Sequence, residues 1–75
     1  MVTIQGTIGA VMETWPLQLT VVAGVERHSV TLSEATVIRR AGRPADPSAL
    51  APGLRVTVRG PAQPGGVLAE EIVVD

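Results

Sequence analysis

One stretch decides the fold: residues 50–60, which read Leu-Ala-Pro-Gly-Leu-Arg-Val-Thr-Val-Arg-Gly. A Pro-Gly turn comes first, and apolar residues then alternate with polar ones until Gly60 ends the run. Such alternation places one set of side chains on a buried face of a β-strand and the other set in water. The stretch therefore predicts a turn followed by a half-buried strand, in which Leu54, Val56 and Val58 face the core.

The same alternation predicts a long first strand over residues 2–12. Its inward side chains are expected to be Val2, Ile4, Ile8, Ala10 and Met12. Gly6 occupies another inward position, where a missing side chain lets a strand bend sharply around a small barrel. Strands two and three are predicted over residues 17–23 and 28–32, and the β-branched run 36–38 extends the third.

The fifth strand, residues 67–74, changes phase in its middle. An unbroken alternation would bury Glu70 together with Ile72 and Val74. A β-bulge near Glu70 and Glu71 keeps both carboxylates in water, and bulges are common at barrel corners.

Loops and turns complete the pattern. Three segments that contain proline or glycine are predicted to be loops: residues 13–16, 24–26 and 61–66. Residues 39–47 are the longest break, and residues 46–51 fit one helical turn with Asp46 as N-cap and Pro47 at the first helical position. Five strands with a short helical turn between the third and fourth follow the order of an OB-fold. We therefore expect a single all-β domain over residues 1–75, a five-stranded OB-fold-like Greek-key small barrel.

The size and charge of the chain limit its function. It has 75 residues, no cysteine and a net charge of −1, and all six of its positive charges are arginines. A chain this small buries a limited fraction of its surface, so we expect it to form a homo-oligomer. The slightly negative charge argues against a dedicated nucleic-acid binder, whose surface is usually basic.

Residues 1–12 lack the features of a signal peptide, and no run approaches the roughly 18 apolar residues of a membrane span. As the chain stands, we expect a cytoplasmic protein without membrane contact. If the chain is a domain cut from a longer precursor, we expect an exported protein instead.

Seven segments share their pattern with a known family: Gly6-Thr7-Ile8, Leu19-Thr20-Val21, Val30-Thr31-Leu32, Ala35-Thr36-Val37-Ile38, residues 50–56, Val58-Arg59-Gly60 and residues 66–74. Together they resemble a bacterial family catalogued as domain of unknown function number 5666, which is built as G-x-V, L-x-V, V-x-V, T-x-I, L-x-x-G-x-x-V-x-V-x-G and G-x-L-x-A-x-x-I. The resemblance implies a small OB-like barrel, found as repeats or in exported and lipid-anchored proteins, with no catalytic residues. This chain lacks the lipobox cysteine of such exported proteins.

Most of the positive charge gathers in residues 39–60, where five arginines stand against one aspartate and give a local charge of +4. An OB-fold can use a basic channel and stacking aromatics to bind single-stranded nucleic acid. The favoured alternative is that Arg55 or Arg59 forms an exposed ion pair with Glu70 or Glu71, worth about 0 to 1 kcal/mol. The candidate ligand or partner surface is formed by five residues: Trp15, Arg39, Arg40, Arg55 and Arg59.

Trp15 and His28 each have two interpretations. Trp15 precedes a proline in the first loop, where it either stacks on a ligand or, as we favour, plugs a barrel end or a subunit contact. His28 is the only histidine, and we expect it at the rim of the barrel, bonded to a backbone carbonyl. No cluster with metal-ligand spacing surrounds it, so we expect no metal and no cofactor.

Two functional hypotheses follow. The first is a non-enzymatic OB-like binding or assembly module that associates with itself through unpaired strand edges. The alternative is a weak single-stranded nucleic-acid binder that uses the arginine-rich face. We do not expect an enzyme, because the sequence has no nucleophile with an adjacent base, no metal cluster and no cofactor fingerprint.

Overall fold

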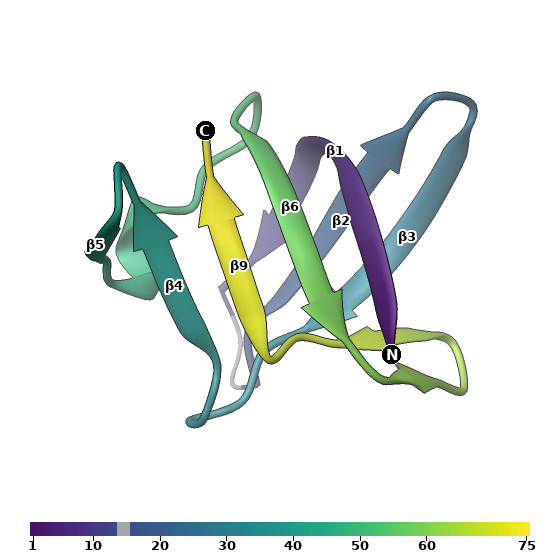
Figure 1. The fold of residues 1–75 in the computed structure, drawn as a ribbon. Coiled ribbons are helices and arrows are strands. Elements are labelled where there is room, and N and C mark those ends of the chain that lie inside the picture. The colour runs from purple at the N-terminus through teal and green to yellow at the C-terminus, as the bar shows by residue number, and fades with distance from the viewer. Residues whose placement is uncertain (14–15) are drawn as a thin grey trace.

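The structure is a computed structural model of the chain and describes residues 1–13 and 16–75. Within these two ranges the protein is all-β, as predicted, with nine strands and one short helical turn. The strands form one mixed sheet in the order β5-β4-β9-β6-β1-β2-β3-β8-β7, so the sheet has two ends and is not closed (Figure 1).

The structure contains more strands than the sequence predicts. The elements are β1 (Val2–Met12), β2 (Gln18–Ala23), β3 (Glu26–Thr31), β4 (Val37–Arg40), β5 (Arg43–Pro44), η1 (Pro47–Ala49), β6 (Arg55–Gly60), β7 (Ala62–Gln63), β8 (Gly66–Leu68) and β9 (Glu71–Val74). The expected fifth strand is divided into β8 and β9, and two-residue strands β5 and β7 lie in segments that were expected to be loops.

β1 bends between two neighbours. It pairs with β6 over residues 2–7 and with β2 over residues 7–12, and its register shifts between Ile8 and Ala10. The shift turns Val11 towards the core, so the prediction that Ala10 and Met12 face inward is wrong: both are exposed. Gly6 is needed where the strand bends, because a Cβ atom there would run into the backbone carbonyl oxygen of Val22.

β8 and β9 are separated at Ala69 and Glu70, close to the position at which the sequence predicts a bulge. β8 runs parallel to β3, whereas β9 runs antiparallel to β6 and parallel to β4. At the junction, the Ala69 N–H donates to the Thr31 carbonyl at 2.9 Å and the Glu70 N–H donates to the Arg59 carbonyl at 2.8 Å. The chain thus changes partners within two residues, and Glu70 stays in water as expected.

Residues 36–38 do not extend the third strand. A turn intervenes, in which the Thr36 N–H donates to the Ser33 carbonyl and the Thr36 hydroxyl accepts from the Ser33 N–H at 2.9 Å. The same hydroxyl donates to the Ala69 carbonyl at 2.7 Å, which holds the turn against the junction of β8 and β9. The chain is redirected, and β4 pairs with β9 instead.

The helical turn η1 is a single 3-10 turn that begins at Pro47, as predicted. Asp46 occupies the N-cap position, as predicted, but its side chain makes no capping hydrogen bond. Its backbone carbonyl accepts from the Ala49 N–H at 2.9 Å instead.

The core is aliphatic throughout. Val56 and Val58 of the opening stretch are buried as predicted, whereas Leu54 is only partly buried at its margin. The buried cluster consists of Ile4, Ile8, Leu19, Val21, Val30, Leu32, Ile38, Leu50, Val56, Val58, Val67, Ala69, Ile72 and Val74. No polar side chain is buried among the residues that the structure describes. Functional groups must therefore lie on the surface.

Candidate functional site

Glu71 lies at the centre of an arginine cluster on the outer face of β4, β9 and β6. Its Oε2 atom is 3.2 Å from Arg39 Nε, and its Oε1 atom is 3.7 Å from Arg59 Nη2. The sheet sets this arrangement, because Arg59 lies directly opposite Glu71 on β6 and Arg39 lies on the other neighbouring strand. One carboxylate therefore bridges two arginines that are 20 residues apart in the sequence.

The expected ion pair between Arg59 and Glu71 is confirmed. Arg39 joins it, which the sequence did not indicate. About half of each arginine side chain is exposed, so each pair contributes at most about 1 kcal/mol. The contacts favour a salt-bridged surface over a free basic groove at these two positions.

The other arginines are not brought into the same cluster. Arg40 lies at the end of β4, opposite Arg43 of β5. Arg55 begins β6, four residues before Arg59, and its backbone carbonyl accepts from the Asp75 N–H at 3.0 Å. Within the described part of the chain, neither Arg40 nor Arg55 forms an ion pair. The predicted arginine-rich face is thus divided into separate groups.

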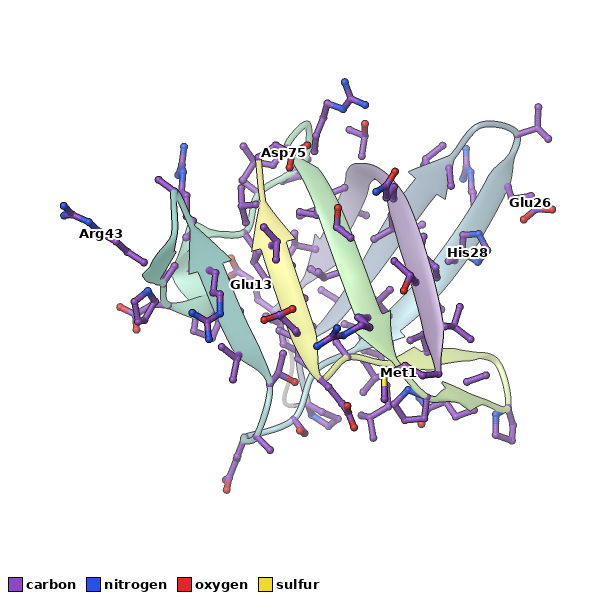
Figure 2. The ribbon with its side chains drawn as sticks, in the orientation of Figure 1. Met1, Glu13, Glu26, His28, Arg43 and Asp75 are labelled. Atoms are coloured by element: carbon purple, nitrogen blue, oxygen red, sulfur yellow. The ribbon has the colours of Figure 1, made fainter. Side chains whose placement is uncertain are left out.

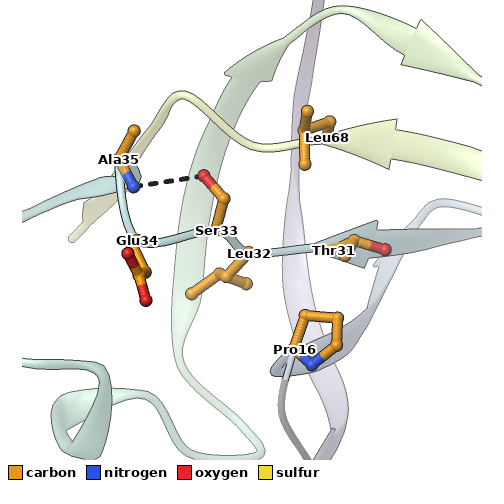
Figure 3. A pocket seen from close by; sticks show the side chains of 7 residues that line it. All are labelled: Pro16, Thr31, Leu32, Ser33, Glu34, Ala35 and Leu68. Carbon is orange, nitrogen blue, oxygen red and sulfur yellow. Dashed lines mark hydrogen bonds between the residues drawn. The ribbon is translucent and has the colours of Figure 1, made fainter.

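Trp15 lies outside the described residues. Its described neighbour Pro16 lines an open hollow of about 600 Å³ together with residues from two other segments (Figure 3). The lining residues are Pro16, Thr31, Leu32, Ser33, Glu34, Ala35 and Leu68. Leucine, proline and alanine side chains make the hollow mainly apolar, with Glu34 as its one ionisable group. A smaller hollow of about 200 Å³ lies between Leu17 and η1.

His28 lies near a carboxylate rather than a backbone carbonyl. Its Nε2 atom is 3.4 Å from Glu26 Oε2, on the same strand two residues earlier, and both side chains are at least partly exposed (Figure 2). The expectation of a carbonyl partner is therefore wrong. Among residues 1–13 and 16–75, no three His, Cys, Asp or Glu side chains gather where they could hold a metal ion.

The outer edge of β3 is only partly paired. β2 covers one side of the whole strand, but on the other side β8 pairs with Val30 and Thr31 alone. The Thr31 carbonyl, which bonds Ala69, points to that outer side. Since backbone groups alternate along a strand, the N–H groups of Arg27 and Ser29 point the same way. β8 also reaches Ser29, because a Cβ atom on Gly66 would run into the Ser29 carbonyl oxygen. Residues 26–28 therefore present an open strand edge, within the part of the chain that is described.

Sequence reasoning missed two of these features. The β4–β5 hairpin has Ala-Gly at its turn rather than the Asn-Gly or Asp-Gly that marks such a turn. The open edge of β3 depends on where β8 starts to pair with it, which no local pattern indicates. No helix in the described ranges is long and apolar enough to cross a membrane.

No family model matches this chain, and no curated protein matches it. The resemblance to domain of unknown function number 5666 stays a prediction.

Proposed function

We propose that this chain is a non-enzymatic OB-like barrel that works as a binding and assembly module, with a second copy of itself as partner. In this barrel, β8 and β9 together form one bent strand. On that view the pairings run from β1 through β2, β3, β8–β9 and β6 back to β1, which is the cyclic order of five strands in an OB-fold. The backbone bonds of Ala69 and Glu70 support this continuity.

The observation that carries the assembly function is the open edge of β3. Unpaired N–H and C=O groups on a strand edge are a template for another strand. Three residues span about 10 Å, at about 3.3 Å per residue. Two copies related by a twofold axis would pair these edges in antiparallel fashion, so the same residues serve both sides of the contact.

The position of β3 suits such pairing. Figure 1 shows the β2–β3 hairpin extending away from β6 and β9, with its tip free of other elements. Val25 at this tip is fully exposed, although valine is apolar. A second copy would cover part of this apolar surface, and oligomerisation is one way in which a small domain gains stability.

A proline on the open edge tests the proposal. Arg27→Pro removes the outward N–H without removing any bond to β2, because proline is tolerated on strand edges where the N–H faces solvent. Arg27→Ala is the matched control, since it also removes the side chain but keeps the N–H. We expect sedimentation at micromolar concentration to give dimers for the wild type and for Arg27→Ala, and monomers for Arg27→Pro.

A wild-type chain that stays monomeric at all these concentrations would exclude self-association as the function. Equal masses for Arg27→Pro and Arg27→Ala would show that the dimer does not use the edge of β3.

A further inference from the structure

The β4–β5 hairpin carries two arginines directly opposite each other. Arg40 pairs with Arg43 across a turn formed by Ala41 and Gly42, whose φ angles are 54° and 77°. Positive φ at both central residues is the geometry of a type I′ turn, the usual two-residue hairpin. Cα atoms of an opposed pair that exchanges hydrogen bonds lie about 5.5 Å apart. Both side chains therefore leave the hairpin on the same face, next to each other.

This arginine pair lies on a different face from the Glu71 cluster. Arg40 is in phase with Ile38, which is buried and whose carbonyl accepts from the Ala45 N–H at 2.8 Å. Arg39, one residue earlier than Arg40, is on the outer face with Glu71. Arg40 and Arg43 thus lie on the same face of the hairpin as the buried Ile38. They lie beyond the edge of the core, so both are exposed. Figure 2 shows Arg43 directed away from the rest of the molecule.

The two charges have no compensating carboxylate. Within the described residues, neither Arg40 nor Arg43 forms an ion pair, and Glu71 is already shared by Arg39 and Arg59. The next acidic residues after β5 and β9 are Asp46 and Asp75. Each follows a residue that faces the core, Ala45 or Val74. Since side chains alternate along a strand, both carboxylates are expected on the face opposite to Arg40 and Arg43. The pair remains a local concentration of positive charge.

Two features of the hairpin are therefore locally unfavourable. Like charges directly opposite on neighbouring strands destabilise the pairing. Ala41 holds a left-handed conformation that is unfavourable for any residue with a Cβ atom. No described side chain forms an ion pair with either arginine. Local costs of this kind are found where a structure serves a ligand, which makes the turn a candidate site.

We propose that Arg40 and Arg43 bind a doubly charged phosphate group, as carried by a phosphomonoester. The planar guanidinium fork matches phosphate oxygens and makes charge-assisted hydrogen bonds to them. Two forks on adjacent positions of one hairpin face can hold one phosphate between them, and its two negative charges balance the pair. The site does not depend on self-association, because β5 and the open edge of β3 lie on opposite sides of the molecule (Figure 1).

The observations favour a phosphomonoester over a nucleic-acid strand. A strand is bound through a succession of cations that follow its singly charged phosphates, with stacking aromatics between them. Here two arginines meet at one point, and the nearby Arg39 and Arg59 are held by Glu71. A concentrated pair of charges matches a dianion better than an extended chain of monoanions.

The test follows backbone amide resonances of the full chain during titration with inorganic phosphate, at constant ionic strength maintained with chloride. We expect saturable shifts confined to residues 39–45 in the wild type. The double variant Arg40→Gln, Arg43→Gln should bind phosphate at least about tenfold more weakly, since both charge-assisted donors are lost. Arg27→Gln is the matched control, because it removes an exposed arginine far from the hairpin, and it should bind as the wild type does.

A second measurement uses the repulsion between the two arginines. In chloride alone, the double variant should unfold at the same temperature as the wild type or a higher one. Absence of saturable shifts in residues 39–45, or equal phosphate binding by the double variant, would overturn the proposal. An oligonucleotide without terminal phosphates provides the last comparison. If it shifts the same amides at a lower total phosphate concentration than inorganic phosphate does, the proposal is overturned in favour of nucleic acid.

Discussion

Gly60 at the end of β6 lies against Leu68 at the end of β8, a backbone contact that we call the crossing. The crossing and the β4–β5 hairpin each contain a glycine, for opposite physical reasons. At the crossing, Gly60 is buried, and a Cβ atom there would run into the backbone carbonyl oxygen of Leu68. At the hairpin, Gly42 has a φ of 77° and no atom within 4 Å of its would-be Cβ. The first position is constrained by packing of backbone against backbone, and the second only by local conformation. A new side chain at Gly42 therefore has room but strains the backbone, whereas a new side chain at Gly60 has no room.

The largest expected effect is in the core beside the crossing. Ile72 of β9 is fully buried, so Ile72→Ala should cost about 2 to 5 kcal/mol of unfolding free energy, through lost burial and the cavity that remains. Val37 of β4, which is 43% exposed, is the control from the hairpin side, and Val37→Ala should cost no more than about 0.5 kcal/mol. Urea unfolding measures both. Similar losses would show that the two regions do not differ in packing.

The same substitution at both glycines tests the comparison directly. Gly60→Ala should cost about 3 kcal/mol, because overpacking forces two backbone segments apart. Gly42→Ala should cost only about 1 to 2 kcal/mol, the penalty of a left-handed alanine. Thermal or urea unfolding of the two variants gives the difference. If Gly42→Ala proves the more damaging change, conformation rather than backbone packing is the stronger constraint.

The hairpin should accept a stabilising change, which the crossing should not. Ala41→Asn gives an Asn-Gly turn, the preferred sequence for this geometry, and asparagine tolerates positive φ. We expect a gain of about 0.5 to 1 kcal/mol in unfolding free energy, with phosphate affinity unchanged because both arginines remain. Ala51→Asn, at an exposed position outside any strand, is the control for the composition change. An unchanged or lower stability for Ala41→Asn would mean that the turn is not strained.

The same contrast explains what the sequence could predict. Alternation identified Val56 and Val58 as buried, and the conflict between Glu70 and Ile72 indicated an irregularity where the structure separates β8 from β9. Both features follow from local rules on which side chains are compatible with a core. The inward position of Gly6 was also visible, because a glycine in an apolar row leaves a gap.

Other features depended on partners far away in the sequence. The register shift at Gly9 decides whether Ala10 or Val11 faces the core. Both residues are apolar, so the sequence pattern fitted either one. The bridge from Glu71 to Arg39 requires β4 to pair with β9, a contact between residues 32 positions apart. The Arg40–Arg43 pair requires the turn to fall on Ala41 and Gly42, which lack the usual turn signature.

The smallest expected effect concerns the cluster that joins the two regions. Glu71→Gln removes the carboxylate between Arg39 and Arg59, and Glu70→Gln removes the exposed neighbouring carboxylate, which makes no ion pair in the described part of the chain. At low salt, we expect Glu71→Gln to lose about 0 to 1 kcal/mol more than Glu70→Gln. The difference should vanish near 1 M salt, where the Debye length is about 3 Å. Equal stabilities at low salt would show that the cluster does not stabilise the fold.

The Glu71→Gln variant also tests whether Glu71 limits nucleic-acid binding by this face. If Glu71 occupies Arg39 and Arg59, its removal leaves both arginines available on the outer face of β4 and β6. Oligonucleotide binding at low salt should then strengthen relative to Glu70→Gln, although both variants lose one negative charge. Each added phosphate contact should steepen the dependence of log K on log salt by about 0.7 for a single strand. Equal binding by the two variants would show that overall charge, rather than the contacts of Glu71, limits the affinity of this surface for nucleic acid.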